Sequence, residues 1–153
     1  MMFYRFISEN LTDYINEGEW RAGDTDFNYC NLSNADARDI FEEMVAEKGF
    51  FIFPSDLFVN VRARAAQDEN LNETLEGVFR NIEGSAAGTP SERDLKGLFA
   101  DLDVNSPRLG ATVAQRNQKL VKVLDAIGDL PLGSFGDNAI DLFGDTYEYL
   151  MQM

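Results

Sequence analysis

Apolar residues recur along most of this chain at the spacing of three and four residues that is typical of amphipathic helices. The first stripe begins almost at the first methionine, with no capping residue before it, and comprises Phe3, Phe6, Ile7, Leu11, Tyr14 and Ile15. We expect this helix to be cut short at its N-terminal end. A second stripe predicts a helix over about residues 35–48, which ends at Gly49 and packs inward Ile40, Phe41, Met44 and Val45.

Between these two helices, residues 18–34 form a predicted polar loop that contains three aromatic side chains. Large aromatic side chains are usually at least partly buried in soluble proteins. We therefore expect the loop to be held against the core by Trp20, Phe27 and Tyr29.

The short apolar run from Phe50 to Phe53 interrupts the helical pattern and stops at Pro54. It is too short for a helix and is rich in residues that favour β-structure. The run therefore predicts a brief extended segment that forms at most a small β-bridge.

Capping signals locate the starts of the helices that follow. Each is a Ser, Thr or Asn before an apolar stripe, in most cases with Glu or Gln three residues later. They fall at Ser55, at Asn70 with Glu73, at Thr89 with Glu92 (where Pro90 would be the first helical residue), and at Thr112 with Gln115.

The helix after Thr112 is expected to close at Gly128 and Pro131, and to bury an arc made of Val113, Leu120, Val123, Leu124 and Ile127. A last helix is predicted from Asp137 to the chain end, without a cap, burying Ile140, Phe143, Tyr147, Leu150 and Met151. The sequence thus predicts a mainly α fold. Residues 1–153 would form a single multi-helix domain of about six to seven helices, with at most a minor β-element near residues 50–53.

Composition excludes several kinds of chemistry. The chain has 27 acidic and 13 basic residues and no histidine, for a formal net charge of −14. A histidine triad, an imidazole base and a histidine-ligated metal are therefore excluded. Cys30 is the single cysteine, so neither a disulfide within the chain nor a paired-cysteine zinc site can form. No apolar run approaches the roughly 18 residues of a membrane span, and we expect a soluble, cytoplasmic protein without membrane contact.

Two features are weak candidates for chemistry. The acid pairs Asp24 with Asp26 and Glu42 with Glu43 could bind a metal or act as an acid–base pair, but such clusters are usually solvated surface. The stretch from Leu132 to Gly136 (LGSFG) superficially resembles a cofactor loop. It joins two predicted helices, however, and no buried strand precedes it.

The charge is unevenly distributed, and this singles out one basic surface. Residues 1–48 contain eleven acidic and four basic residues, whereas 104–124 contain no acid and four cations, namely Arg108, Arg116, Lys119 and Lys122. On a helix, the last three fall on one arc beside the apolar stripe. This arc is a candidate for contact with phosphates or with a partner subunit, to which Arg62 and Arg64 could add. The alternative is a solvated helix face.

Three blocks of the sequence resemble the N-terminal region of the modification (M) subunits of type I restriction-modification methyltransferases. They are Met2 to Ile15 (MFYRFISENLTDYI), Lys48 to Phe58 (KGFFIFPSDLF) and Asp94 to Asn117 (DLKGLFADLDVNSPRLGATVAQRN). The resemblance continues through Phe143 to Met153 and so covers essentially the whole chain.

The resemblance implies that the parent protein transfers a methyl group from S-adenosylmethionine to adenine N6 in DNA. The glycine-rich cofactor motif and the Asn-Pro-Pro-aromatic tetrapeptide of the family's catalytic domain do not occur here, since all four prolines are isolated. The chain is therefore expected to have no catalytic, cofactor-binding or metal-binding residues of its own.

The implied partners are the specificity (S) subunit, a second M subunit, the restriction (R) subunit and, in the assembled complex, double-stranded DNA. Two other interpretations stay open at this point. An acidic helical protein of this size could be a DNA-mimicking inhibitor, although the acid-free 104–124 stretch argues against it. It could also be a helical adaptor that binds only protein.

Overall fold

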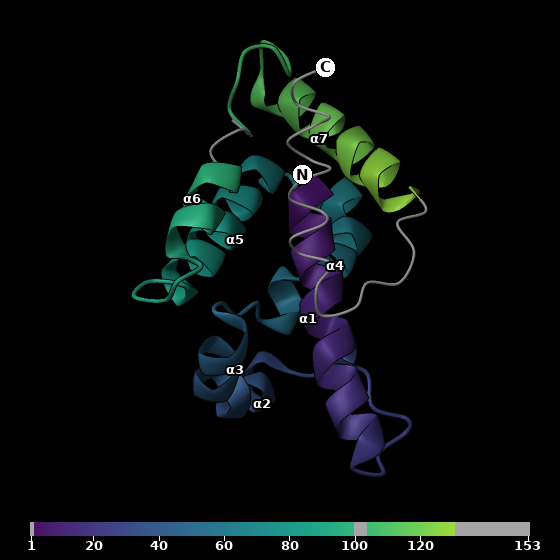
Figure 1. The fold of residues 1–153 in the computed structure, drawn as a ribbon. Coiled ribbons are helices and arrows are strands. Elements are labelled where there is room, and N and C mark those ends of the chain that lie inside the picture. Colours follow the sequence, from purple (N-terminus) through teal and green to yellow (C-terminus); the bar gives the residue numbers. More distant parts are fainter. Residues whose placement is uncertain (1, 100–103, 131–153) are drawn as a thin grey trace.

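The computed structural model describes residues 2–99 and 104–130, and Figure 1 shows their arrangement. Over these ranges the chain folds into helices and short 3₁₀ turns without a strand, which confirms the prediction of a mainly α domain. The α-helices are α1 (Met2–Arg21), α2 (Asn34–Ala37), α3 (Phe41–Lys48), α4 (Phe58–Arg64), α5 (Leu71–Ser85), α6 (Glu92–Phe99) and α7 (Val113–Gly128). The 3₁₀ turns are η1 (Tyr29–Asn31), η2 (Arg38–Ile40), η3 (Pro54–Asp56) and η4 (Ala65–Gln67). The helix predicted from Asp137 and the LGSFG stretch lie outside the described residues.

Helix α1 runs through the middle of the molecule and packs against α4, α7 and η1 (Figure 1). Its predicted stripe is buried except for Tyr14, which is partly buried, and Tyr4 joins the core as well. The helix continues to Arg21, so the predicted loop begins later than expected. Trp20 therefore lies in the last helical turn and is 44% exposed, contrary to the prediction that its ring is held in the core. Its indole N–H instead donates to the Phe27 carbonyl (2.8 Å).

The predicted helix over 35–48 is present, but it is divided into α2, η2 and α3. Met44 is buried, and Phe41 and Val45 pack against the core. The helix ends as predicted at Gly49, which has a φ of +86° and donates its backbone N–H to the Val45 carbonyl (2.9 Å). Glycine is favoured in this left-handed conformation because it has no Cβ atom.

The segment from Phe50 to Leu57 is extended and then turns through η3, and most of it is buried. The small β-bridge considered above does not form among the described residues. Side chains satisfy the backbone instead: the Ser85 hydroxyl accepts from the Phe51 N–H (2.8 Å), and the Tyr29 hydroxyl donates to the Ile52 carbonyl (2.7 Å). This explains how a segment without a strand partner is buried without leaving these groups unpaired.

Two of the predicted caps are wrong. Ser55 lies inside η3, and its hydroxyl accepts a hydrogen bond from the Asn34 amide (2.8 Å) rather than capping α4. Asn70 occupies the N-cap position of α5 but its side chain makes no capping bond. The neighbouring Asp68 carboxylate accepts from the Asn70 N–H (2.9 Å) and from the Thr74 hydroxyl (2.6 Å).

Of the other two capping signals, the one at Thr112 is confirmed, whereas the one at Thr89 does not start a helix at Pro90. Helix α6 begins at Glu92 rather than at Pro90, and the Thr89 hydroxyl lies within hydrogen-bond distance of the Gly49 carbonyl (2.8 Å). The Thr112 cap of α7 is confirmed, because its hydroxyl accepts from the Gln115 N–H (3.2 Å).

No helix among residues 2–99 and 104–130 is long and apolar enough to cross a membrane.

The left-handed turn at Gly49 gives a test of the fold. We expect Gly49→Ala to lower the free energy of unfolding by about 1–2 kcal/mol, because an L-residue is strained at this φ. The new Cβ would also collide with the Ser91 hydroxyl. Urea denaturation measures the effect.

Gly18→Ala is the matched control, since Gly18 lies within α1 and has open space around it. Alanine there should raise the free energy of unfolding by about 0.5–1 kcal/mol. Equal effects of the two substitutions would contradict the assigned role of Gly49.

Candidate interaction surface

The predicted basic arc lies on α7, which crosses one end of the molecule and packs against α5, α4 and α1 (Figure 1). Leu120 and Leu124 are fully buried, and Val123 and Ile127 are partly buried. Val113 was predicted to belong to this buried face but is 45% exposed. It lies in the first turn, and the buried face of α7 begins only at Asn117.

The N-terminal half of α7 is fixed by a buried amide. The Asn117 side chain accepts from the Asn72 N–H at the start of α5 (3.1 Å) and donates to the Glu69 carbonyl (2.8 Å). The Asn72 amide in turn donates to the Asn105 side chain (2.7 Å). These bonds set the rotation of α7 about its axis, and so the direction in which its exposed side chains point.

The four cations of the arc differ in their surroundings. The Arg116 side chain is partly buried and donates from Nη1 to the Asn105 carbonyl (3.0 Å). Lys119, Lys122 and Arg108 are exposed and make no ion pair among the described residues. Arg116 therefore helps to fix the preceding segment, whereas the other three present their charge to solvent.

Arg62 joins α4 to the C-terminal end of α7. Its guanidinium contacts the carboxylates of Asp125 (3.1 Å) and Asp129 (2.7 Å). Hydrogen bonds from the guanidinium to Asp129 and then Asp125 raise the pKa of Arg62, because they favour its charged form. A Cβ atom at Gly128 would overlap this guanidinium, so the glycine makes room for the contact as well as ending the helix.

Arg5 holds the same end of α7 from α1. Its Nη1 atom donates to the carbonyls of Ile127 and Leu130 (2.6 Å each), and its Nε contacts Glu9 (2.9 Å). Carbonyls at a helix C-terminus have no partner within the helix and carry partial negative charge, which favours a cation there.

Arg64, also predicted to add to the basic surface, donates instead to the Ser55 carbonyl in η3 (2.8 Å). Of the six predicted cations, the structure brings Arg116, Lys119 and Lys122 together on α7 and leaves Arg108 in the preceding segment. Arg62 and Arg64 are engaged in contacts within the fold. Sequence reasoning missed Arg5 and Asn117, because a lone Arg or Asn in a helical stripe gives no signal of a distant partner.

The described residues contain no group of three or more Cys, Asp or Glu that could hold a metal ion. The acid pairs Asp24 with Asp26 and Glu42 with Glu43 are exposed.

A family model described as the HsdM N-terminal domain matches residues 1–127. The chain therefore belongs to the HsdM N-terminal domain family.

Two relatives are similar over nearly the whole chain. The type I restriction enzyme MpnII methylase subunit of Mycoplasma pneumoniae is 42% identical over an alignment of 159 positions, gaps included, which covers 99% of this chain and 29% of the relative. The crystal structure of a type I restriction-modification system methyltransferase subunit from Streptococcus thermophilus superposes with a TM-score of 0.69 at 25% identity. That match covers 99% of this chain and 32% of the solved one. The chain thus spans less than a third of either relative.

The Arg62 ion pairs give a second test. We expect Arg62→Met, which keeps the aliphatic stem, to lower the free energy of unfolding at low ionic strength, because both ion pairs are lost. In roughly 1 M salt most of this loss should disappear, because partly exposed ion pairs are screened.

Arg80→Met is the control, since Arg80 is exposed on α5 and forms no ion pair among the described residues. It should change the free energy of unfolding by less than about 0.5 kcal/mol. A loss at Arg62 that is independent of salt would show that the contacts act through packing rather than charge.

Proposed function

We propose that this chain is the non-catalytic N-terminal domain of a type I restriction-modification adenine-specific DNA methyltransferase subunit. Its role is to assist assembly with the specificity subunit and to engage DNA through Arg108, Arg116, Lys119 and Lys122. The parent protein transfers the methyl group of S-adenosylmethionine to adenine N6 in DNA, in a complex that also contains a second M subunit and the R subunit. The membership of the chain in the HsdM N-terminal domain family supports this proposal.

The proposed DNA contact rests on one observation, the exposure of two lysines on α7 that form no ion pair among the described residues. Lys119 and Lys122 are exposed and have no carboxylate partner among the described residues, on a helix whose rotation Asn117 fixes. Lys and Arg side chains of this kind bind the phosphate backbone and position a duplex without reading its sequence.

The net charge of the chain limits what the domain does alone. With a formal charge of −14, it repels DNA at long range, and a few surface cations do not overcome this. In the assembled enzyme, other surfaces bring the duplex near. Contacts outside the catalytic pocket then help to hold the duplex while a base leaves the stack.

The test uses the complete methyltransferase and the double variant Lys119→Gln with Lys122→Gln. Arg116 is left unchanged because it also donates to Asn105. We expect DNA binding to weaken at every sequence, and the slope of log K against log salt to fall by about 1.8, or about 0.9 for each lost phosphate contact. Fluorescence anisotropy across a salt series measures the slope.

Arg93→Gln with Lys96→Gln, two exposed cations on α6, is a control with the same change of charge. It should leave the slope unchanged. If the α7 variant assembles normally and its slope equals that of the wild type, the lysines form only a solvated face. If it fails to assemble, as judged by native mass spectrometry, α7 lies at a subunit interface instead.

A further inference from the structure

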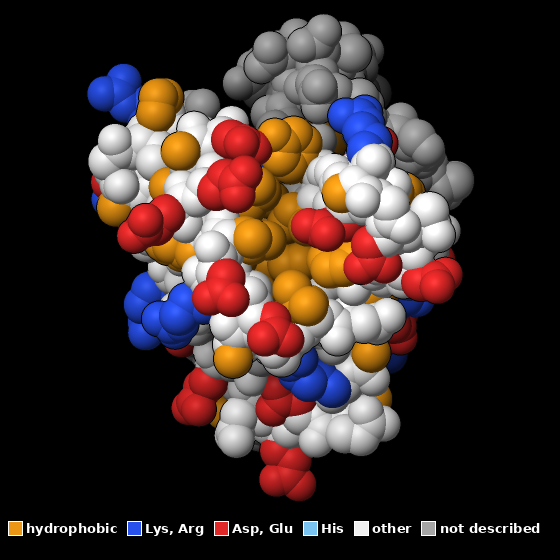
Figure 2. All heavy atoms as spheres, turned by 90° about the horizontal axis from the view of Figure 1, so that it is seen from below, with side chains coloured by type: hydrophobic (Ala, Val, Ile, Leu, Met, Phe, Trp, Pro, Cys, Tyr) orange, Lys and Arg blue, Asp and Glu red, His pale blue; other side chains and the backbone are white. Residues whose placement is uncertain are grey.

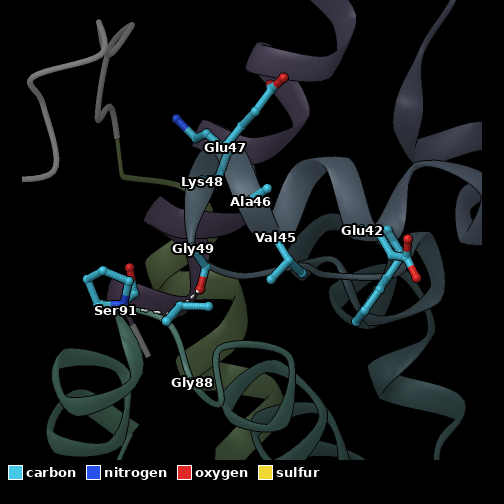
Figure 3. Close-up of a pocket in the computed structure, with 11 residues that line it drawn as sticks. Glu42, Val45, Ala46, Glu47, Lys48, Gly49, Gly88 and Ser91 are labelled. Carbon is cyan, nitrogen blue, oxygen red and sulfur yellow. Dashed lines mark hydrogen bonds between the residues drawn. The ribbon is translucent and has the colours of Figure 1, made fainter.

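The face of α3 that is not packed on the core borders a hollow (Figure 3). Its volume is about 590 Å³, and its walls are α3 with Gly49 on one side and residues 88–91 on the other. A second hollow of about 500 Å³ adjoins it at Phe41 and Glu42 and reaches Phe53. We call the two together the α3 groove. Its apolar lining comprises Phe41, Val45, Ala46, Phe53 and Pro90.

Part of this lining is open to solvent, and a hollow with apolar walls can receive the apolar side chains of a ligand or partner. Ala46 and Pro90 are exposed, and Phe41, Val45 and Phe53 are only partly buried. Helix α3 lies at the opposite end of the molecule from α7 in Figure 1. The face of the domain seen from below in Figure 2 also combines apolar side chains in a hollow with acidic side chains on both sides.

The charged residues that line the α3 groove are three acids, Asp39, Glu42 and Glu47, and two cations, Arg38 and Lys48. Asp39 and Glu42 line it and Glu43 is their neighbour; all three are exposed and form no ion pair among the described residues. The two cations lie over aromatic rings. Arg38 lies 5.7 Å from the centre of the Phe53 ring, and Lys48 lies 4.7 Å from that of Tyr14.

The other cations of the first 48 residues are engaged as well. Arg5 contacts Glu9 (2.9 Å), and Arg21 contacts Glu17 (3.8 Å). With eleven acids and four cations, this part of the chain presents apolar surface edged by net negative charge. The complementary ligand carries an apolar stripe edged by positive charge.

From this complementarity we infer that the α3 groove binds a basic amphipathic helical segment of another protein. The mode is that of a helix in a groove, in which apolar anchors at helical spacing enter the hollow. Lys or Arg side chains beside the anchors then meet Asp39, Glu42 and Glu43. Helix α3 has eight residues, about 12 Å in length, so the contact spans two or three turns of the ligand.

Charge disfavours the other occupants. A second copy of the chain brings another net charge of −14, and DNA brings phosphates to the same acids. Residues 131–153 of this chain contain no cation and four acids, namely Asp137, Asp141, Asp145 and Glu148. The inference is independent of the proposed DNA contact, because the two surfaces lie on α3 and α7, so either can fail alone.

The first experiment measures binding of a synthetic 18-residue peptide with Leu at helical spacing and Lys elsewhere. We expect it to bind the chain at least tenfold more tightly than a scrambled peptide of the same composition, because only the former has an apolar stripe. Asp39→Lys with Glu42→Lys should weaken binding about tenfold, which corresponds to about 1.4 kcal/mol. Glu69→Lys with Glu73→Lys, two exposed acids before and within α5, makes the same change of charge and should have little effect.

The contribution of the apolar lining is tested separately by Ala46→Trp, which fills the groove without changing its charge. It should weaken binding about tenfold, whereas Ala63→Trp on the exposed face of α4 should not. Equal binding of the two peptides, or equal effects of groove and control variants, would overturn the inference in favour of unspecific attraction to an acidic protein.

The last experiment identifies the occupant directly. The photoreactive residue p-benzoylphenylalanine replaces Ala46, and mass spectrometry locates the crosslinks. Crosslinks to the Leu/Lys peptide support the inference. Crosslinks to residues 131–153 of the same chain, or to a second copy, that persist when the peptide is present would overturn it.

Discussion

The fold depends on hydrogen bonds to the backbone of one largely buried, irregular stretch, from Phe50 to Leu57. Backbone N–H and C=O groups cannot be buried without partners, and this stretch has no strand beside it among the described residues. Its partners are side chains from four parts of the chain. The Tyr29 hydroxyl of η1 donates to the Ile52 carbonyl, and the Ser85 hydroxyl of α5 accepts from the Phe51 N–H. The Asn60 amide of α4 donates to the Pro54 carbonyl (2.7 Å), and the Tyr4 hydroxyl of α1 donates to the Asp56 carbonyl. The helices are thereby placed around a common centre.

The arrangement separates two kinds of surface. Helix α7 carries exposed cations at one end of the domain, and α3 carries exposed acids around an apolar groove at the other (Figure 1). Such a separation allows one small domain to meet an anionic and a cationic partner at the same time. A formal net charge of −14 opposes unspecific binding to nucleic acid. In the function we propose, the cations of α7 would act only where another surface has already brought the duplex near.

The helices and much of the core could be predicted from sequence, because apolar stripes repeat at the helical period. The Thr112 cap and the Gly49 terminus were also predictable, since each depends on residues within one turn. Ser55, Asn70 and Trp20 were misjudged, because tertiary partners or a longer helix decided their environment. For the candidate surface, the stripe on α7 was visible in the sequence, whereas the engagement of Arg62 was not. Its partners lie 63 and 67 residues away.

The two ends of α7 are attached by different chemistry. Hydrogen bonds of the neutral Asn117 side-chain amide hold the N-terminal half, and the guanidinium groups of Arg5 and Arg62 hold the C-terminal end. Salt screens the ion pairs of Arg62 and has little effect on the hydrogen bonds of Asn117, which are between neutral groups. The contacts at the C-terminal end of α7 should therefore weaken as the salt concentration rises, whereas those at Asn117 should not. Backbone amides near Gly128 should then exchange with solvent sooner than those near Asn117, long before the domain as a whole unfolds.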